Sequence, residues 1–85
     1  MRITILYFAA LREALGTGRE SVELPEGVVD AGKLRTWLRE RGGAWAEALD
    51  ENRSVRIAVN QAMARADTPL PAGAEVAFFP PVTGG

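Results

Sequence analysis

The stretch Glu75-Val-Ala-Phe-Phe79, taken together with Arg2-Ile-Thr-Ile-Leu-Tyr-Phe8 near the other end of the chain, decides the fold. Both stretches are short and rich in β-branched and aromatic residues, which is typical of β-strands. Successive side chains of a strand point to opposite faces of the sheet. The side chains predicted to point into the core are therefore Ile3, Ile5, Tyr7, Val76 and Phe78.

Helices are predicted between these two strands. Two leucines four residues apart, followed by Gly16, predict a short helix over residues 9–15. Asp30 is the expected N-cap of the main helix, and a glycine pair ends that helix. One further helical turn is expected over residues 45–49. The apolar stripe of the main helix consists of Leu34, Trp37 and Leu38.

Three further strands are predicted from alternation of apolar and polar residues. They cover residues 19–24, 54–60 and, after a turn at Asn60-Gln61, the very short segment 62–63. The resulting order predicts an α+β domain over residues 1–79, with a mixed sheet packed against one main helix. The β-grasp (ubiquitin-like) fold fits this order and places the first and last strands side by side in the centre of the sheet. Residues 80–85 are expected to form an extended tail.

Composition excludes several functional classes. The 85 residues are 47% hydrophobic and 25% charged, the ordinary mixture of a single globular domain. Cysteine and histidine are absent from the sequence, so no thiolate nucleophile, no histidine base and no metal site are expected. Basic and acidic side chains are interspersed, so binding to nucleic acid or to a membrane is not expected. No basic segment precedes the first apolar run, so we expect no signal peptide and a cytoplasmic location.

The side chains that could support catalysis have simpler interpretations. The glycine pairs follow helices, whereas a phosphate-binding loop precedes one. Both tryptophans lie at helix-core spacing. A binding or carrier module is therefore a better interpretation than a self-contained catalyst. The acidic residues interpreted as solvated surface groups are Glu20, Glu23, Glu26, Asp50 and Glu51.

The outer face of the predicted sheet is unusually apolar. Leu6 and Phe8 of the first strand alternate with its core residues, and Ala77 and Phe79 do so on the last strand. If these two strands are neighbours, the four side chains form one patch, which Met63 extends. Exposed apolar patches of this kind mark partner-binding sites, and Phe and Met are enriched at interface cores.

The end of the sequence is the second feature that suggests a function. Pro80 and Pro81 stop the ladder and favour an extended course into Val82-Thr83-Gly84-Gly85. A Gly-Gly segment has no Cβ and is the thinnest chain possible, so it is suited to a narrow channel. Its terminal carboxylate is a poor electrophile as an anion and a good one once activated as an acyl adenylate.

These residues resemble a known family. The stretch Asp67–Gly85, the opening Leu6-Tyr-Phe-Ala-Ala-Leu-Arg-Glu13 and the central Ala58-Val-Asn-Gln61 are similar to the small subunit of molybdopterin synthase, a ubiquitin-like sulfur carrier. The similarity covers the whole chain. One departure is Ala74, which stands where the family commonly has an aspartate and is expected to alter only a turn.

The resemblance implies a defined cycle. An activating enzyme would adenylate Gly85 with ATP, a sulfur donor protein would convert the adenylate into a thiocarboxylate, and the tail would enter the large synthase subunit. There the thiocarboxylate would supply sulfur to cyclic pyranopterin monophosphate. The chain itself would bind no cofactor, would be a co-substrate subunit and would assemble as two small and two large subunits.

The resemblance also assigns roles to individual residues. Gly85 is implied as the reactive residue and Gly84 as the residue that allows the tail to thread. The implied partner contacts are Phe8, Met63, Phe79, Pro80, Pro81, Val82 and Thr83. Two other readings stay open: a ubiquitin-like protein modifier, and a sulfur carrier for thiamine synthesis or tRNA thiolation.

Overall fold

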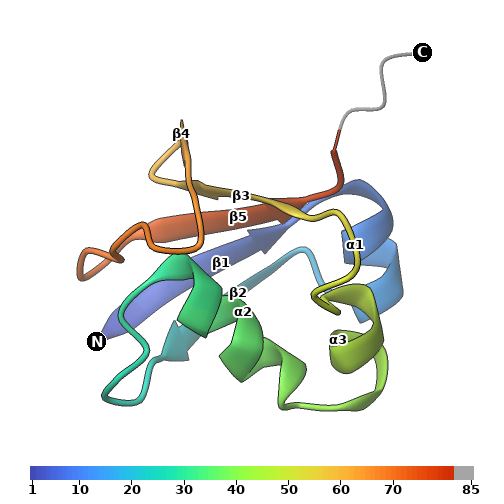
Figure 1. Cartoon of the computed structure of the whole chain (residues 1–85), viewed down its shortest axis with the longest axis horizontal. Coiled ribbons are helices and arrows are strands. Elements are labelled where there is room, and N and C mark those ends of the chain that lie inside the picture. Colours follow the sequence, from blue (N-terminus) through green and yellow to red (C-terminus); the bar gives the residue numbers. More distant parts are fainter. Residues whose placement is uncertain (82–85) are drawn as a thin grey trace.

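The computed structural model describes residues 1–81. Its architecture is a five-stranded sheet with helices α2 and α3 on one side and α1 at one end (Figure 1). The elements are β1 (Arg2–Tyr7), α1 (Ala9–Leu15), β2 (Arg19–Glu23), α2 (Ala31–Arg39), α3 (Gly43–Ala48), β3 (Arg56–Val59), β4 (Ala62–Met63) and β5 (Glu75–Phe79).

The sheet has the strand order β2-β1-β5-β3-β4. The two strands from opposite ends of the chain, β1 and β5, are parallel neighbours in its centre, and all other pairs are antiparallel. The α+β class and the β-grasp arrangement predicted from the order of elements are therefore confirmed.

The core lies between the inner face of the sheet and the helices. Alternation along β1 and β5 predicted its sheet side correctly, and the main helix contributes Leu34 and Leu38, both fully buried. Trp37 and Trp45 pack against this core and are partly buried. Ala74 is also buried, at 1% exposure, so the expectation that this position affects only a turn was incomplete. The central sheet residues of the core are Ile3, Ile5, Tyr7, Val76 and Phe78.

Local signals account for the ends of the elements. The Asp30 carboxylate accepts a hydrogen bond from the Lys33 amide at 2.8 Å, as expected of an N-cap. Gly16 ends α1 with φ of 73°, a left-handed conformation that glycine adopts without cost. Asn60 and Gln61 also have positive φ, of 49° and 69°, as the tight turn between β3 and β4 requires.

Three strands are shorter than alternation predicted. β2 ends at Glu23 rather than at residue 24. β1 ends at Tyr7, because Phe8 becomes the N-cap of α1 and Ala9 takes a φ of 53°. β3 starts at Arg56 rather than at residue 54, since the pairing with β5 begins where Arg56 lies opposite Phe79. Alternation describes an extended chain, but only a neighbouring strand decides how far that chain belongs to the sheet.

Glu20 is not the solvated surface group that the sequence suggested. It lies on the inner side of the edge strand β2, where its carboxylate accepts a hydrogen bond from the Tyr7 hydroxyl at 2.8 Å. Both terminal nitrogens of Arg41 also donate to it, each at 2.9 Å. The Arg41 guanidinium lies 4.3 Å from the centre of the Trp45 ring. Glu20 therefore links the buried Tyr7 to the surface.

This link predicts an acid-sensitive contribution to stability. Partial burial acts to raise the pKa of Glu20, but hydrogen bonds from Arg41 and Tyr7 and the charge of Arg41 outweigh it and lower the pKa below 4.5. A carboxylate with a depressed pKa stabilises the fold above its unfolded pKa, and this contribution disappears as the pH falls through the folded pKa. We expect Glu20→Gln to lower the free energy of unfolding by roughly 1–2 kcal/mol at neutral pH.

Urea unfolding at neutral pH and well below pH 4.5 measures this effect. The difference between the wild type and Glu20→Gln is expected to shrink at the lower pH. Glu26→Gln is the matched control, because Glu26 is exposed on a turn. An equal difference at both pH values would show that the Glu20 carboxylate charge does not stabilise the fold.

Candidate partner-binding face

The strand register builds a continuous apolar row across the outer face of the sheet. Leu6 lies beside Ala77, Ala77 beside Ala58, and Ala58 beside Met63. The row therefore crosses β1, β5, β3 and β4. Together with the two phenylalanines at the ends of β1 and β5, it forms what we call the outer-face patch: Leu6, Phe8, Ala58, Met63, Ala77 and Phe79.

The large side chains of the outer-face patch are open to solvent. Phe8 is 47% exposed and Met63 is 60% exposed, whereas Phe79 has intermediate exposure. The Phe8 amide donates to the Phe78 carbonyl at 3.1 Å, so Phe8 continues beside β5 after β1 has ended. The structure thus assembles the patch that alternation predicted, and Phe8, Met63 and Phe79 lie on it. Ala58 is also part of it, although its small side chain is 9% exposed between Ala77 and Met63.

Polar and charged residues surround the outer-face patch. On one side, Glu75 and Asn60 are joined by two hydrogen bonds of 2.8 and 2.9 Å. Arg19 lies opposite Leu6 on β2, and Arg56 lies opposite Phe79 on β3. An apolar centre with a polar rim is the usual anatomy of a protein interface.

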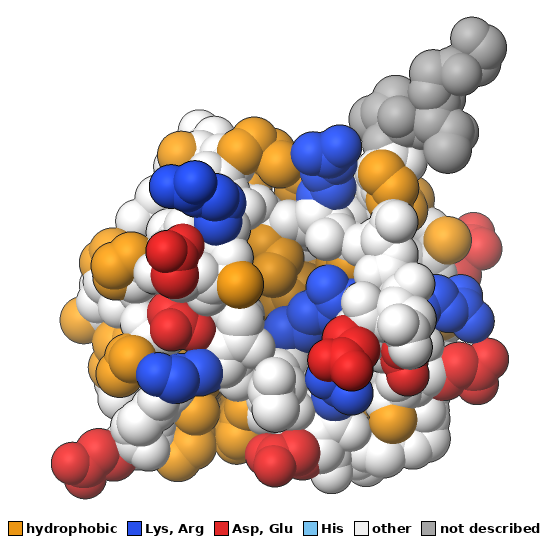
Figure 2. All heavy atoms as spheres, viewed as in Figure 1, with side chains coloured by type: hydrophobic (Ala, Val, Ile, Leu, Met, Phe, Trp, Pro, Cys, Tyr) orange, Lys and Arg blue, Asp and Glu red, His pale blue; other side chains and the backbone are white. Residues whose placement is uncertain are grey.

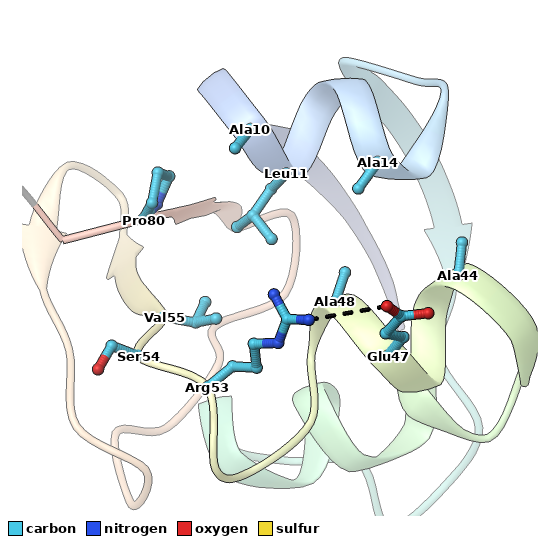
Figure 3. Close-up of a pocket in the computed structure, with 10 residues that line it drawn as sticks. All are labelled: Ala10, Leu11, Ala14, Ala44, Glu47, Ala48, Arg53, Ser54, Val55 and Pro80. Carbon is cyan, nitrogen blue, oxygen red and sulfur yellow. Dashed lines mark ion pairs between the residues drawn. The ribbon is translucent and has the colours of Figure 1, made fainter.

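Pro80 and Pro81 leave the sheet directly beside the outer-face patch and are partly buried. The remaining residues predicted to form the tail, Val82, Thr83, Gly84 and Gly85, lie outside the described residues. Pro80 borders a cavity of about 280 Å³ between α1 and α3. Figure 3 shows alanine methyl groups and Leu11 around this cavity, with the Glu47–Arg53 ion pair at one side.

A second hollow, of about 350 Å³, lies between α2, the start of β3 and the segment that follows β4. We call it the arginine hollow, because Arg35, Arg56 and Arg65 line it together with Met63 and Pro81. Figure 2 shows it near the middle of the view, with hydrophobic side chains at its floor and Lys or Arg side chains around it. The sequence analysis missed it. Arg56 and Arg65 flank the turn between β3 and β4, whereas Arg35 lies on α2, and no local motif connects the three.

The described residues present apolar and basic surface features as candidate binding sites. Within residues 1–81, no polar or charged residue is buried as a whole, and no three His, Cys, Asp or Glu side chains are grouped to hold a metal ion. In the same part of the chain, no helix has the length and apolar character needed to cross a membrane. The described chain therefore offers the outer-face patch, the two hollows and the proline pair as candidate functional features.

A β-grasp domain with these features is a ubiquitin-like protein. The ThiS family model matches residues 5–85, and the chain belongs to this family. Together with the curated relatives described next, this match confirms the resemblance stated from the sequence. Membership of this family establishes the fold and common descent with its other members. The particular role of the chain is addressed by individual relatives that align over its full length.

Two curated relatives align over nearly the full length of both chains. The molybdopterin synthase sulfur carrier subunit of Escherichia coli is 43% identical over 98% of this chain and 99% of its own. The protein of the same name from Mycobacterium tuberculosis is 41% identical over 100% of this chain and 99% of its own. Among solved structures, the small archaeal modifier protein SAMP1 of Haloferax volcanii is 26% identical, with a TM-score of 0.80 and full coverage of both chains.

Proposed function

We propose that this chain is the sulfur carrier subunit of molybdopterin synthase and that the outer-face patch binds the large subunit. One observation carries the proposal: β5 presents Phe79 to this patch and then leads through Pro80 and Pro81 toward Gly84-Gly85. A partner bound to the patch would therefore be next to the start of the tail. The names of the full-length relatives support the same role.

The proposed chemistry takes place on the carboxylate of Gly85. The carboxylate oxygen attacks the α-phosphorus of ATP on an activating enzyme, which releases pyrophosphate and leaves an acyl adenylate. The terminal sulfur of a persulfide on a donor protein then attacks the acyl carbon and displaces AMP. A thiol of the donor cleaves the resulting acyl disulfide, which releases the thiocarboxylate and leaves a disulfide on the donor. Transfer of this sulfur to cyclic pyranopterin monophosphate on the large subunit, with water supplying the oxygen, regenerates the carboxylate.

The chain's own residues fit the role of a carrier. The sequence has no cysteine, so sulfur would be carried on the terminal carboxyl group rather than on a thiol. ATP would bind to the activating enzyme, and the proposed assembly contains two small and two large subunits. Location in the cytoplasm remains a prediction.

Reconstitution tests this proposal. The chain is prepared as its C-terminal thiocarboxylate, mixed with the large subunit from the same organism and with cyclic pyranopterin monophosphate, and the products are followed by mass spectrometry. We expect conversion of the precursor together with loss of sulfur from the carrier. The E. coli carrier, tested with the same large subunit, is the positive control. If that control converts the precursor and this chain leaves it unchanged, the proposal is refuted.

A second function has a specific observation in its favour. The similarity to SAMP1, whose name describes a protein modifier, fits conjugation of Gly85 to lysine side chains of other proteins. Both functions would begin with adenylation, so a thiocarboxylate mass alone cannot separate them. Enrichment of the chain from cells of its source organism followed by a search for Gly-Gly remnants on lysines would identify conjugation. Identification of the proteins that are enriched together with the chain would reveal a carrier for thiamine synthesis or tRNA thiolation.

A further inference from the structure

The arginine hollow carries a positive charge that the described part of the chain does not neutralise. Arg56 and Arg65 are exposed, and within residues 1–81 neither forms an ion pair with a carboxylate. No aspartate or glutamate lines the hollow within the same range. Within residues 1–81, two of its three cations therefore have no carboxylate partner and can meet an external anion.

The third cation is held in place by the fold. Arg35 donates through Nε to the Leu49 carbonyl at 2.8 Å and through Nη2 to the Arg53 carbonyl at 2.9 Å. These bonds tie the loop before β3 to α2 and leave Nη1 without a protein partner within residues 1–81. The hollow thus combines one positioned guanidinium with two exposed ones. A guanidinium binds carboxylate in a defined, often bidentate geometry.

The arginine hollow is continuous with the outer-face patch. Met63 belongs to both, and Arg56 lies opposite Phe79 in the β3–β5 register. Pro81, two residues after Phe79, lines the hollow as well. A protein that covers the patch and follows the chain from Phe79 toward the tail would therefore pass over the hollow.

We infer that the partner which covers the outer-face patch places an aspartate or glutamate side chain in the arginine hollow. This inference rests on the proposed function, because it concerns the same interface. The apolar patch would supply most of the contact area, and the acidic contact would orient the partner toward the tail. Charge complementarity of this kind accelerates association and determines which partners bind.

The test compares two double variants that remove the same charge. Arg56→Ala/Arg65→Ala removes the two exposed cations of the hollow. Arg2→Ala/Arg12→Ala removes two exposed arginine side chains that line neither hollow. We expect the first pair to weaken binding to the large subunit by about ten-fold or more, mainly through slower association and with a shallower salt dependence. The control pair is expected to stay close to the wild type.

Inorganic phosphate distinguishes a partner carboxylate from a small anion. We expect millimolar phosphate to reduce binding to the large subunit no more than sodium chloride of equal ionic strength. Saturable binding of phosphate to the free chain, lost in Arg56→Ala/Arg65→Ala, would assign the hollow to a small anion and overturn the inference.

The variants also separate this inference from the proposed function. If Phe79→Ala weakens binding while Arg56→Ala/Arg65→Ala behaves like its control, the inference is wrong and the proposed interface stands. If neither change weakens binding, the proposed interface itself is wrong, and the inference is wrong with it.

Discussion

Deletion of Gly85, or addition of one residue after it, is expected to abolish sulfur transfer and to leave the fold of residues 1–81 intact. The proposed reacting group is the terminal carboxylate, and each residue changes the reach of an extended chain by about 3.3–3.6 Å. A misplacement of about 1 Å can already lower a reaction rate by roughly 100-fold. Conversion of cyclic pyranopterin monophosphate, measured with the chemically prepared thiocarboxylate of each variant, gives the result.

One residue added before Met1 is the matched control, since it lengthens the chain equally without moving Gly85. Thermal unfolding of all variants checks that the domain stays folded. Its core lies within residues 1–81, so a change at residue 85 is not expected to alter its stability. Conversion at the native rate by either Gly85 variant would show that sulfur does not travel on the carboxylate of this residue.

Two adjacent phenylalanines are expected to respond in opposite ways to the same substitution. Phe78 is fully buried and stacks on Tyr7 with ring centres 6.0 Å apart. Phe78→Ala is therefore expected to cost about 3–5 kcal/mol of unfolding free energy. That is a large part of the roughly 5–15 kcal/mol that stabilises a typical domain.

Phe79 lies on the opposite face of β5, within the outer-face patch. Phe79→Ala is expected to change stability much less and to weaken binding to the large subunit by about 30-fold, the effect of an interface residue worth about 2 kcal/mol. Denaturant unfolding and titration calorimetry on both variants measure the two quantities. A large loss of stability for Phe79→Ala with unchanged affinity would show that Phe79 is a core residue and that the proposed interface lies elsewhere.

Features with a local period could be predicted from the sequence. Alternation separated Val76 and Phe78 from Ala77 and Phe79, because a strand repeats every two residues whatever its neighbour. The helix cap at Asp30 was equally predictable, since the carboxylate and the amide that it accepts are three residues apart. The Gly-Gly end suggested chemistry, although residues 82–85 lie outside the described part and their roles stay predictions.

The contacts between distant segments depended on the tertiary structure. The sequence placed Glu20 on the surface, but the β1–β2 register brings it to Tyr7, and the chain after α2 brings Arg41 to Glu20. Local patterns also did not bring Arg35, Arg56 and Arg65 together. They meet because the segment that follows β4 runs to α2, where the Gly32 amide donates to the Ala66 carbonyl. The period of each segment carries no information about the distance between segments.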